Sequence, residues 1–221
     1  MKMVVVGGSG FIGKVLVKKL KAKSASRRET LSIDLQKPKT LAKLKKFSVI
    51  IHCAAKVNYT WLPWFQIYKK LYQTNVEGTK NLLKTVTPKY FVFLSTLAVY
   101  NSQKLKVLKP RSFYGLTKYL AELKCKEYAK KKKFKLLIIR LPMVYDVREP
   151  KREAWLFKKF GWVLQFLRPL LKKKKIRVIS RKKAINLICS LIKKRKEGVV
   201  DIKGNLIDLS HFLDIMTKNK K

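Results

Sequence analysis

The chain has 221 residues, of which 47% are hydrophobic, enough for one α/β domain with a buried core and a small additional part. No stretch has the unbroken apolar length of a membrane span, and the first predicted strand starts too early for a signal peptide. The formal net charge is +42, with lysine spread over every predicted helix and loop. This spread favours a compositional bias over specific nucleic-acid binding, although such a field attracts polyanions nonspecifically. Three scattered cysteines, Cys53, Cys125 and Cys189, match no metal-binding spacing and suit reduced thiols in a cytoplasm.

The first predicted strand, Met3–Val6, is a short apolar run typical of a buried parallel strand. Gly-Gly-Ser-Gly-Phe-Ile-Gly at 7–13 follows at once, and residues 14–20 have helical spacing. Glycines leave the backbone open to a diphosphate on the helix N-terminus and let the helix pack close to the strand. A strand, a glycine loop and a helix in this order therefore predict a dinucleotide site, with a plain glycine-rich turn as the alternative.

The next two predicted strands carry the residues that would distinguish NAD from NADP. The strand over 23–28 ends in Arg27 and Arg28, and arginine at this place suits the 2′-phosphate of NADP. The strand over 31–35 carries Asp34, which would lie beside the adenine. These positions favour NADP over NAD, while a solvated turn would also account for both arginines.

Strands and helices alternate along most of the remaining chain. His52 ends one buried segment without a second histidine or an acid beside it, so we interpret it as a packed core residue. The expected elements are a helix over 38–46, a strand over 47–55, a loop and helix over 58–72, a helix opened by Thr74 and closed by Pro88, a strand over 90–96, a helix opened by Ser112 and a strand over 135–140. This alternation predicts an α/β fold with a parallel, doubly wound sheet.

The regular alternation loosens after Leu141. We therefore expect an NAD(P)-binding domain over 1–141 and a reduced substrate-binding subdomain over 142–221. Residues 155–175 combine an amphipathic, aromatic segment with lysines, which fits a membrane surface or, as we prefer, a helix that covers the substrate pocket. The elements expected after this segment are a strand over 177–179, a helix over 182–194, a strand over 198–202 and a helix over 210–216.

Tyr114 and Lys118 are four residues apart at the start of a predicted helix, so their side chains share one face. A free tyrosine has a pKa of about 10, and a nearby ammonium group lowers it towards neutrality. Thr96, at the end of a neighbouring strand, could hydrogen-bond the same substrate oxygen. Together they predict proton transfer at a hydroxyl-bearing carbon while a nicotinamide takes the hydride, although Tyr-x-x-x-Lys pairs also arise by chance in a lysine-rich chain.

The order of these motifs resembles the extended short-chain dehydrogenase/reductases of the NAD-dependent epimerase/dehydratase family, which have a Rossmann fold. The resemblance covers about two thirds of the chain. The matching pieces are Gly-Gly-Ser-Gly-Phe-Ile-Gly (7–13), Asp-Leu (34–35), His-Cys-Ala-Ala (52–55), Asn-Val-Glu-Gly-Thr (75–79), Ser-Thr-Leu-Ala-Val-Tyr (95–100), Tyr-Gly-Leu-Thr-Lys (114–118) and Arg-Leu-Pro-Met-Val-Tyr (140–145).

The resemblance implies a role for each matching residue. The residues implied at the cofactor are Gly7, Gly10, Phe11, Ile12 and Gly13 around the phosphates, Asp34 and Leu35 beside the adenine, Ala54 and Ala55 behind the cofactor, and Pro142 and Val144 near the nicotinamide. The residues implied in the chemistry are Thr96 at the substrate oxygen, Tyr114 as acid/base, Lys118 on the ribose and Asn75 in support of the site. The resemblance also implies a homodimer through the helices at 76–86 and 113–131.

Two departures from the family pattern concern the substrate. The stretch between Gly13 and His52 is short, similar to the compact layout of the dTDP-4-dehydrorhamnose reductase type. The part after Pro142 is shorter than the usual substrate domain of the family, although residues 198–205 resemble a piece of it.

Three hypotheses for the function follow. The first is an NAD(P)-dependent oxidoreductase that acts on a hydroxyl or keto carbon of a small molecule, such as a nucleotide sugar or a similar anionic substrate. The second is a non-catalytic NAD(P)-binding sensor or assembly protein, and the third is a basic binder of RNA or membrane surfaces. The combination of Thr96, Tyr114 and Lys118 favours the first.

Overall fold

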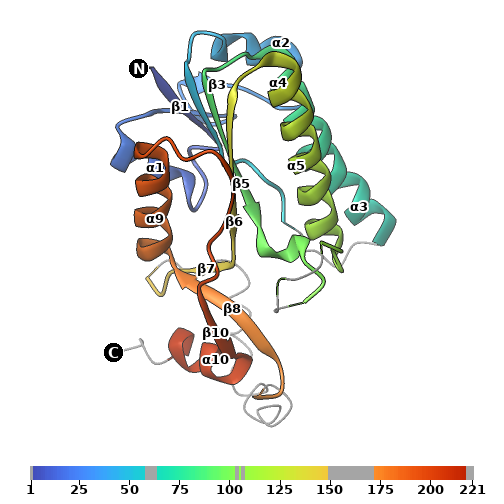
Figure 1. The fold of residues 1–221 in the computed structure, drawn as a ribbon, viewed down its shortest axis with the longest axis vertical. Helices are drawn as coiled ribbons and strands as arrows, with labels where there is room; N and C mark the ends of the chain where they lie inside the picture. The colour runs from blue at the N-terminus through green and yellow to red at the C-terminus, as the bar shows by residue number, and fades with distance from the viewer. Residues whose placement is uncertain (1, 58–63, 103–104, 106–107, 149–171, 218–221) are drawn as a thin grey trace.

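The computed structural model describes residues 2–57, 64–102, 105, 108–148 and 172–217. Its centre is a seven-stranded parallel sheet with the strand order β3-β2-β1-β4-β5-β6-β9 (Figure 1). The strands are β1 (Met3–Val6), β2 (Lys23–Ser26), β3 (Leu31–Ser32), β4 (Val49–His52), β5 (Tyr90–Thr96), β6 (Lys135–Leu141) and β9 (Gly198–Asp201). After β1 the chain adds β2 and β3 on one side of it, and then β4, β5, β6 and β9 on the other side. The predicted doubly wound parallel sheet is therefore confirmed.

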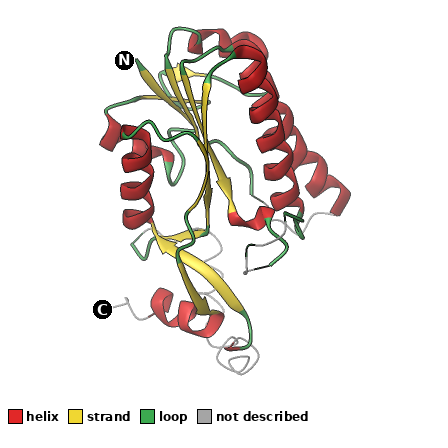
Figure 2. Cartoon of the chain, viewed as in Figure 1, coloured by secondary structure: helices red, strands yellow, loops and turns green. Residues whose placement is uncertain are grey.

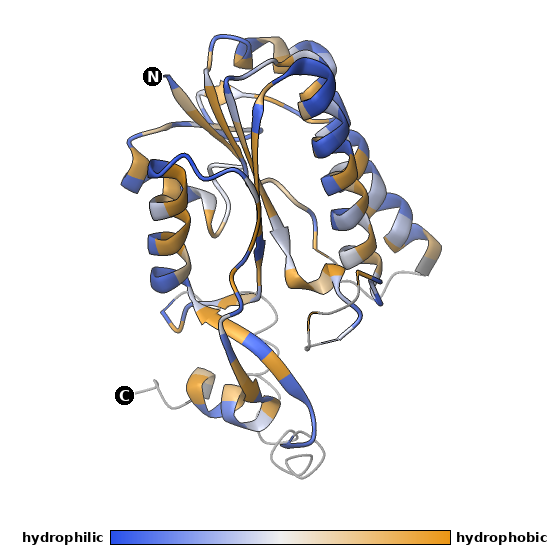
Figure 3. Cartoon of the chain, in the orientation of Figure 1, coloured by the Kyte–Doolittle hydropathy of each residue, from blue (hydrophilic) through white to orange (hydrophobic). Residues whose placement is uncertain are grey.

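Helices cover both faces of this sheet (Figure 2). Successive side chains of a strand point to opposite faces. Val5 therefore packs in one buried cluster with Leu16 and Ile188, and Val4 packs in another with Leu82 and Ala121. The apolar strands lie between helices whose outer sides are hydrophilic (Figure 3). The helices α1 (Gly13–Leu20) and α9 (Arg181–Lys193) lie on one face, and α2 (Pro38–Leu41), α4 (Gly78–Thr85) and α5 (Phe113–Lys132) lie on the other. The helix α3 (Trp64–Tyr72) packs against α5, on the outer side of this layer.

A second, three-stranded sheet lies beyond the carboxyl ends of the large sheet (Figure 1). It contains β7 (Met143–Tyr145), β8 (Lys175–Ser180) and β10 (Asn205–Asp208), and α10 (Leu209–Thr217) packs against it. Between β8 and β10 the chain returns to the large sheet through α9 and β9. Residues 142–217 therefore contribute to both sheets.

The elements that carry the central motifs match the sequence prediction closely. The strand β5 has the predicted bounds, and α5 begins directly after Ser112. The Ser112 hydroxyl oxygen accepts a hydrogen bond of 3.0 Å from the Gly115 N–H, which is the capping contact expected of a serine at a helix start.

Several sequence expectations differ from the structure, among them the strand over 23–28, which ends at Ser26. Thr74 does not open a helix, because a π-helical turn, η2 (Gln73–Glu77), joins α3 directly to α4. The strand expected over 31–35 ends at Ser32, since Asp34 forms a turn in which its carboxylate accepts from the Gln36 N–H. The short strands β7 and β10 were not expected from the sequence, because each has few residues and pairs with β8 from another part of the chain.

The amphipathic segment over 155–171 lies outside the described residues, so its predicted position over the pocket or at a membrane surface stays a prediction. The helices of the described ranges contain no stretch with the length and hydropathy of a membrane span.

Candidate functional site

Two adjoining cavities open at the carboxyl ends of the parallel strands. The larger has a volume of about 780 Å³ and lies between the ends of β5 and β6, the strands β7 and β8, and the start of α5. The smaller has a volume of about 510 Å³ and lies between the glycine loop after β1, the turn after β2 and the segment after β4. Cys53 and Ala55 line both cavities, so the two are continuous along this edge. Ligands of doubly wound sheets bind at this edge.

Close backbone contacts require glycine at two positions of the loop after β1. Gly7 has a φ of +83°, and a Cβ there would lie 2.7 Å from the backbone nitrogen of Ala54. A Cβ on Gly13 would collide with the carbonyl oxygen of Gly7. The helix α1 starts at Gly13, and its N-cap residue, Ile12, makes no side-chain capping bond. The Lys14 N–H donates to the Gly10 carbonyl at 2.9 Å and the Val15 N–H to the Ile12 carbonyl at 3.2 Å, so α1 offers an anionic ligand the positive end of its dipole beside an open glycine loop.

The end of β2 carries cations and no carboxylate. Arg27 and Arg28 follow Ser26, the last residue of the strand, and line the smaller cavity. The Ser26 hydroxyl oxygen accepts a hydrogen bond of 3.0 Å from the Ser9 hydroxyl in the glycine loop. Asp34 is the only carboxylate among the described residues that line this cavity. An acidic residue at the end of the second strand holds the ribose hydroxyls of NAD, so its absence here bears on the choice of cofactor.

The two hydroxyl residues at the end of β5 have different environments. Ser95 is 5% exposed, and its hydroxyl donates a hydrogen bond of 2.5 Å to Glu122. Thr96 is half-buried and lines the larger cavity, where its oxygen accepts from the Ala98 N–H at 3.2 Å. An accepting oxygen keeps its own proton for donation. Thr96 is therefore the hydroxyl of the pair that is able to donate to a ligand.

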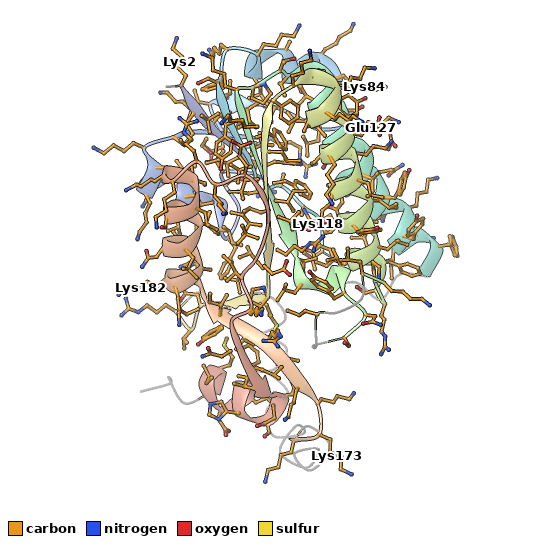
Figure 4. All side chains as sticks on the ribbon, in the orientation of Figure 1. Lys2, Lys84, Lys118, Glu127, Lys173 and Lys182 are labelled. Atoms are coloured by element: carbon orange, nitrogen blue, oxygen red, sulfur yellow. The ribbon has the colours of Figure 1, made fainter. Side chains whose placement is uncertain are left out.

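Tyr114 lies in the first turn of α5, half-buried, and lines the larger cavity together with Thr96. Lys118 lies one turn further, between α5 and the sheet, and is 2% exposed (Figure 4). Its Nζ is 3.9 Å from the ring centroid of Phe93, and no side chain or carbonyl of the described residues accepts a hydrogen bond from it. Burial lowers the pKa of Lys118 to about 8, so at neutral pH it remains mostly a buried ammonium group with unused hydrogen-bonding capacity.

His52 beside this lysine is a packed residue, as the sequence predicted. It is fully buried, and its Nε2 lies 3.0 Å from the Thr79 hydroxyl oxygen. Because the Thr79 hydroxyl donates to the Asn75 carbonyl, His52 Nε2 is the donor in this contact. Burial, and then the charge of Lys118, lower the pKa of His52 to about 3, so the imidazole is neutral. Its position in the core leaves it no role at the cavity.

Asn75 lies in the π-helical turn η2 and connects three parts of the site. Its side-chain oxygen accepts from the Lys56 N–H at 2.8 Å, and its amide donates to the Lys56 carbonyl at 3.0 Å. The same amide donates to the Thr117 hydroxyl at 3.1 Å, next to Lys118 in α5. Asn75 lines neither cavity, so it positions the segment after β4 against α5 instead of contacting a ligand there. A π-turn in a helix is common at functional sites.

A buried ionic network borders the larger cavity. Glu122 of α5, with no exposed surface, accepts from Arg140 Nε at 3.0 Å and from Arg140 Nη2 at 2.7 Å. Arg140 also donates to the Tyr100 hydroxyl oxygen at 2.8 Å, and Tyr100 donates to Asp201 at 2.5 Å. Burial and the hydrogen bond to Asp201 raise the pKa of Tyr100. Tyr100 therefore stays protonated, although it lines the same cavity as Tyr114.

The charge in the larger cavity is positive. Among the described residues that line it, Arg111 before α5 and Arg177 of β8 carry charge, and no aspartate or glutamate does. The remaining wall is mostly apolar or carries hydroxyl groups. Guanidinium groups bind phosphate and carboxylate through paired N–H donors. The cavity is therefore suited to a ligand with an anionic group.

The predicted site residues fall into three sets in the structure. Those that line the smaller cavity are Gly7, Gly10, Arg27, Asp34, Leu35, Ala54 and Ala55. Those that line the larger cavity are Ile12, Ala55, Thr96, Tyr114, Pro142 and Val144. Those that line neither are Phe11, Gly13, Asn75 and Lys118. Phe11 instead lies under the Arg181 guanidinium, whose carbon is 4.6 Å from the ring centroid.

Sequence reasoning assigned no role to Arg111, Arg177, Glu122, Arg140 or Tyr100. Two of these residues belong to the matching motifs, since Tyr100 ends Ser-Thr-Leu-Ala-Val-Tyr and Arg140 opens Arg-Leu-Pro-Met-Val-Tyr. Glu122 is four residues after Lys118 on the same helix face. Nothing in the sequence around Arg111 and Arg177 distinguishes them from the many other cations of the chain.

The chain is similar in sequence to one protein family and to two curated proteins. The model of the NAD dependent epimerase/dehydratase family matches residues 3–182. GDP-6-deoxy-D-talose 4-dehydrogenase of Aggregatibacter actinomycetemcomitans is 32% identical over 142 residues, which are 55% of this chain and 46% of that protein. D-erythronate dehydrogenase of Haemophilus influenzae is 27% identical over 176 residues, which are 65% of this chain and 55% of that protein. The chain thus spans about half the length of the curated relatives it matches.

Among solved structures, MoeE5 in complex with UDP-glucuronic acid and NAD has a TM-score of 0.81 and 19% sequence identity. The alignment covers 100% of this chain and 82% of that one. At this identity the likeness concerns the fold, and it agrees with the doubly wound sheet described above.

Proposed function

The chain belongs to the NAD-dependent epimerase/dehydratase family, and we propose that it is an NAD(P)-dependent oxidoreductase that acts on a hydroxyl or keto carbon of an anionic sugar derivative. The observation that carries the proposal is the shared cavity of Thr96 and Tyr114, which continues into the cleft over the glycine loop. Dehydrogenase chemistry in the two curated relatives supports the same class of reaction.

The residues of the cleft fit a nicotinamide dinucleotide. The open backbone between Gly7 and Gly13 and the positive dipole end of α1 suit the diphosphate. The small side chains of Ala54 and Ala55 leave room behind it. Lys118 has unused N–H donors, and a ribose hydroxyl oxygen would accept a hydrogen bond from one of them. A bound nicotinamide supplies the hydride acceptor or donor.

In the proposed reaction Thr96 donates a hydrogen bond to the substrate oxygen, and Tyr114 exchanges a proton with the same oxygen. The positive charge of Lys118 favours the phenolate of Tyr114, because an ammonium group stabilises a nearby anion. Asn75 is a positioning residue that holds the segment after β4 and the helix α5 together. The apolar wall of Pro142 and Val144 limits access of water to the reacting carbon.

We propose that the substrate carries a phosphate or a carboxylate. Arg111 and Arg177 are the described charged residues on the cavity wall, and guanidinium groups bind phosphate and carboxylate through paired N–H donors. The named substrates of the two curated relatives, a GDP-linked sugar and a sugar acid, are both anionic. In this proposal, the small sheet formed by β7, β8 and β10 provides the reduced substrate-binding part.

The proposed activity is tested by following the nicotinamide absorbance with NADPH or NADH. The substrate panel contains GDP-, UDP- and dTDP-linked keto sugars and four-carbon sugar acids, with neutral sugars as controls. Turnover of one anionic class, and none of the neutral sugars, is the expected result. Binding of NAD(P)H without turnover of any member would favour the non-catalytic sensor instead.

We further propose that NADP is preferred over NAD. The Arg27→Ala variant should bind NADPH about ten- to a hundredfold more weakly, because a charge-assisted contact contributes about 1.5–3 kcal/mol and 1.4 kcal/mol is tenfold in affinity. NADH affinity should stay within twofold. Fluorescence titration of both cofactors measures the change, with Lys89→Ala as control, because Lys89 is exposed and lies directly before β5, at the end of the strands opposite the cleft. An equal loss for both cofactors would show that Arg27 does not read the 2′-phosphate.

A homodimer through the outer sides of α4 and α5 is the partner arrangement that we propose. The two helices lie side by side on one face of the sheet (Figure 1). Leu123 is 42% exposed and Phe113 is 38% exposed on α5, which gives this surface apolar contacts for a second copy. Light scattering of the full chain tests the arrangement, with Leu123→Glu expected to yield monomers.

A further inference from the structure

The edge of the large sheet opposite the cleft, where the strands begin, has an unusual charge distribution. Every turn that leads from a helix into the next strand of this sheet lies there, together with the N-terminus. Lys2, before β1, and Lys84, in the last turn of α4, mark this end of the molecule (Figure 4). We call it the amino edge. Its exposed cations are Lys2, Lys21, Lys23, Lys45, Lys46, Lys84, Lys89, Lys131, Lys133, Lys135, Lys194, Arg195 and Lys196.

Acidic residues are almost absent from the amino edge. In the described part of the chain Glu197 is the one carboxylate of these turns, and it is paired with Lys135 at 2.7 Å. Glu127 of α5 lies near Lys84 (Figure 4) and is paired with Lys124 at 2.6 Å. The opposite edge is mixed, since Asp34, Asp146 and Asp201 lie there among the cations. The lysines are therefore spread through the sequence, but most of the carboxylates that offset them lie elsewhere in the fold.

The helix dipole explains part of this distribution. The helices α1, α4, α5 and α9 all end at the amino edge, and a cation in the last turn of a helix is stabilised there. Lys132 performs this role directly, because its Nζ donates to the carbonyls of Leu83 and Val86 at the end of α4. Each helix end supplies only about half a negative charge, however, so the exposed cations leave the amino edge strongly positive.

We propose that the amino edge is a second binding surface, which takes the phosphodiester backbone of a nucleic acid without sequence preference. Closely spaced phosphates match a face of lysines that has almost no acids, and release of their counterions drives binding. A membrane is the less suitable partner, because the aromatic side chains in these turns, Phe47, Tyr90 and Phe134, are buried and none is available for insertion. The proposal goes beyond the oxidoreductase function, and the cleft at the other edge stays open.

The test compares two variants with the same net charge. In the first, Lys2, Lys45, Lys89 and Lys196 of the amino edge are changed to Gln. In the second, four exposed lysines away from the amino edge, Lys172, Lys173, Lys182 and Lys203, are changed to Gln; Lys173 marks the opposite end of the molecule (Figure 4). The dissociation constant for a single-stranded oligouridylate is measured over a series of salt concentrations for both variants and the unchanged chain. NADPH titration of both variants reports whether the cleft is intact.

The amino-edge variant should lose up to about three units of the salt slope, since each lost phosphate contact in a single strand removes about 0.7. Its affinity at low salt should fall at least tenfold, while the control variant changes it less than threefold. Equal losses in the two variants would overturn the proposal, because the whole surface would then act as one field. The proposal would also be overturned if the amino-edge substitutions weakened binding to vesicles of phosphatidylserine and phosphatidylcholine but left oligouridylate binding unchanged.

Discussion

The Tyr114→Phe variant should lose about a thousandfold in kcat and bind NADPH as the unchanged chain does. General acid–base catalysis by one positioned side chain contributes about 10²–10⁴-fold, and the substitution removes the phenol hydroxyl alone. Tyr114 lines the larger cavity together with Thr96, so its ring should keep its place when the hydroxyl is removed. Turnover measured with the substrate found in the panel gives kcat, and fluorescence titration gives the cofactor affinity.

Tyr119→Phe is the matched control, because Tyr119 is a half-buried tyrosine of the same helix that lines neither cavity. It should keep kcat within twofold. A Tyr114→Phe variant that retains most of its turnover would contradict the proposed mechanism. Tyr100 would then be the phenol to test next, although its hydrogen bond to Asp201 and its raised pKa make it a poor base.

The fold could be predicted from the sequence where local signals agree with tertiary packing. Strand β5 is an apolar run buried on both faces, and α5 has a serine at its N-cap. The prediction that a helix starts at Thr74 was wrong, because the polar residues around Thr74 are typical of a helix start. Here their side chains instead serve tertiary contacts, as Asn75 does with Lys56 and Thr117. The polarity of the sequence alone does not distinguish a helix start from a group of side chains that make tertiary contacts.

The candidate site was predictable to the extent that its residues lie within short motifs. Thr96 and Tyr114 were each found from the end of a strand and the start of a helix, and the structure brings them to one cavity. Arg177 could not be found, because it enters the wall through β8, whose pairing with β7 joins segments far apart in the chain. A lysine- and arginine-rich sequence also hides functional cations among solvated ones.

The buried ion pair of Arg140 and Glu122 carries the largest expected effect on stability. Arg140→Met should lower the free energy of unfolding by about 3–5 kcal/mol, because it leaves the Glu122 carboxylate buried without its partner. Glu122 would keep the hydrogen bond from Ser95 and the charge of Lys118 one turn away, and neither replaces the hydrogen-bonded guanidinium. Urea unfolding followed by circular dichroism measures the loss as a lower midpoint with an unchanged slope.

A second substitution separates the charge from the packing. In the double variant Glu122→Gln with Arg140→Met, the amide oxygen of Gln can still accept from Ser95, and neither substituted position carries a buried charge. Replacing both members of a buried ion pair is often close to neutral, so most of the lost stability should return. Lys135→Met, which breaks the exposed pair with Glu197, is the control and should change stability by less than about 1 kcal/mol. If the double variant were as unstable as Arg140→Met alone, the loss would come from the packing of the Arg140 side chain and its contacts with Tyr100, and the stranded carboxylate would not be its cause.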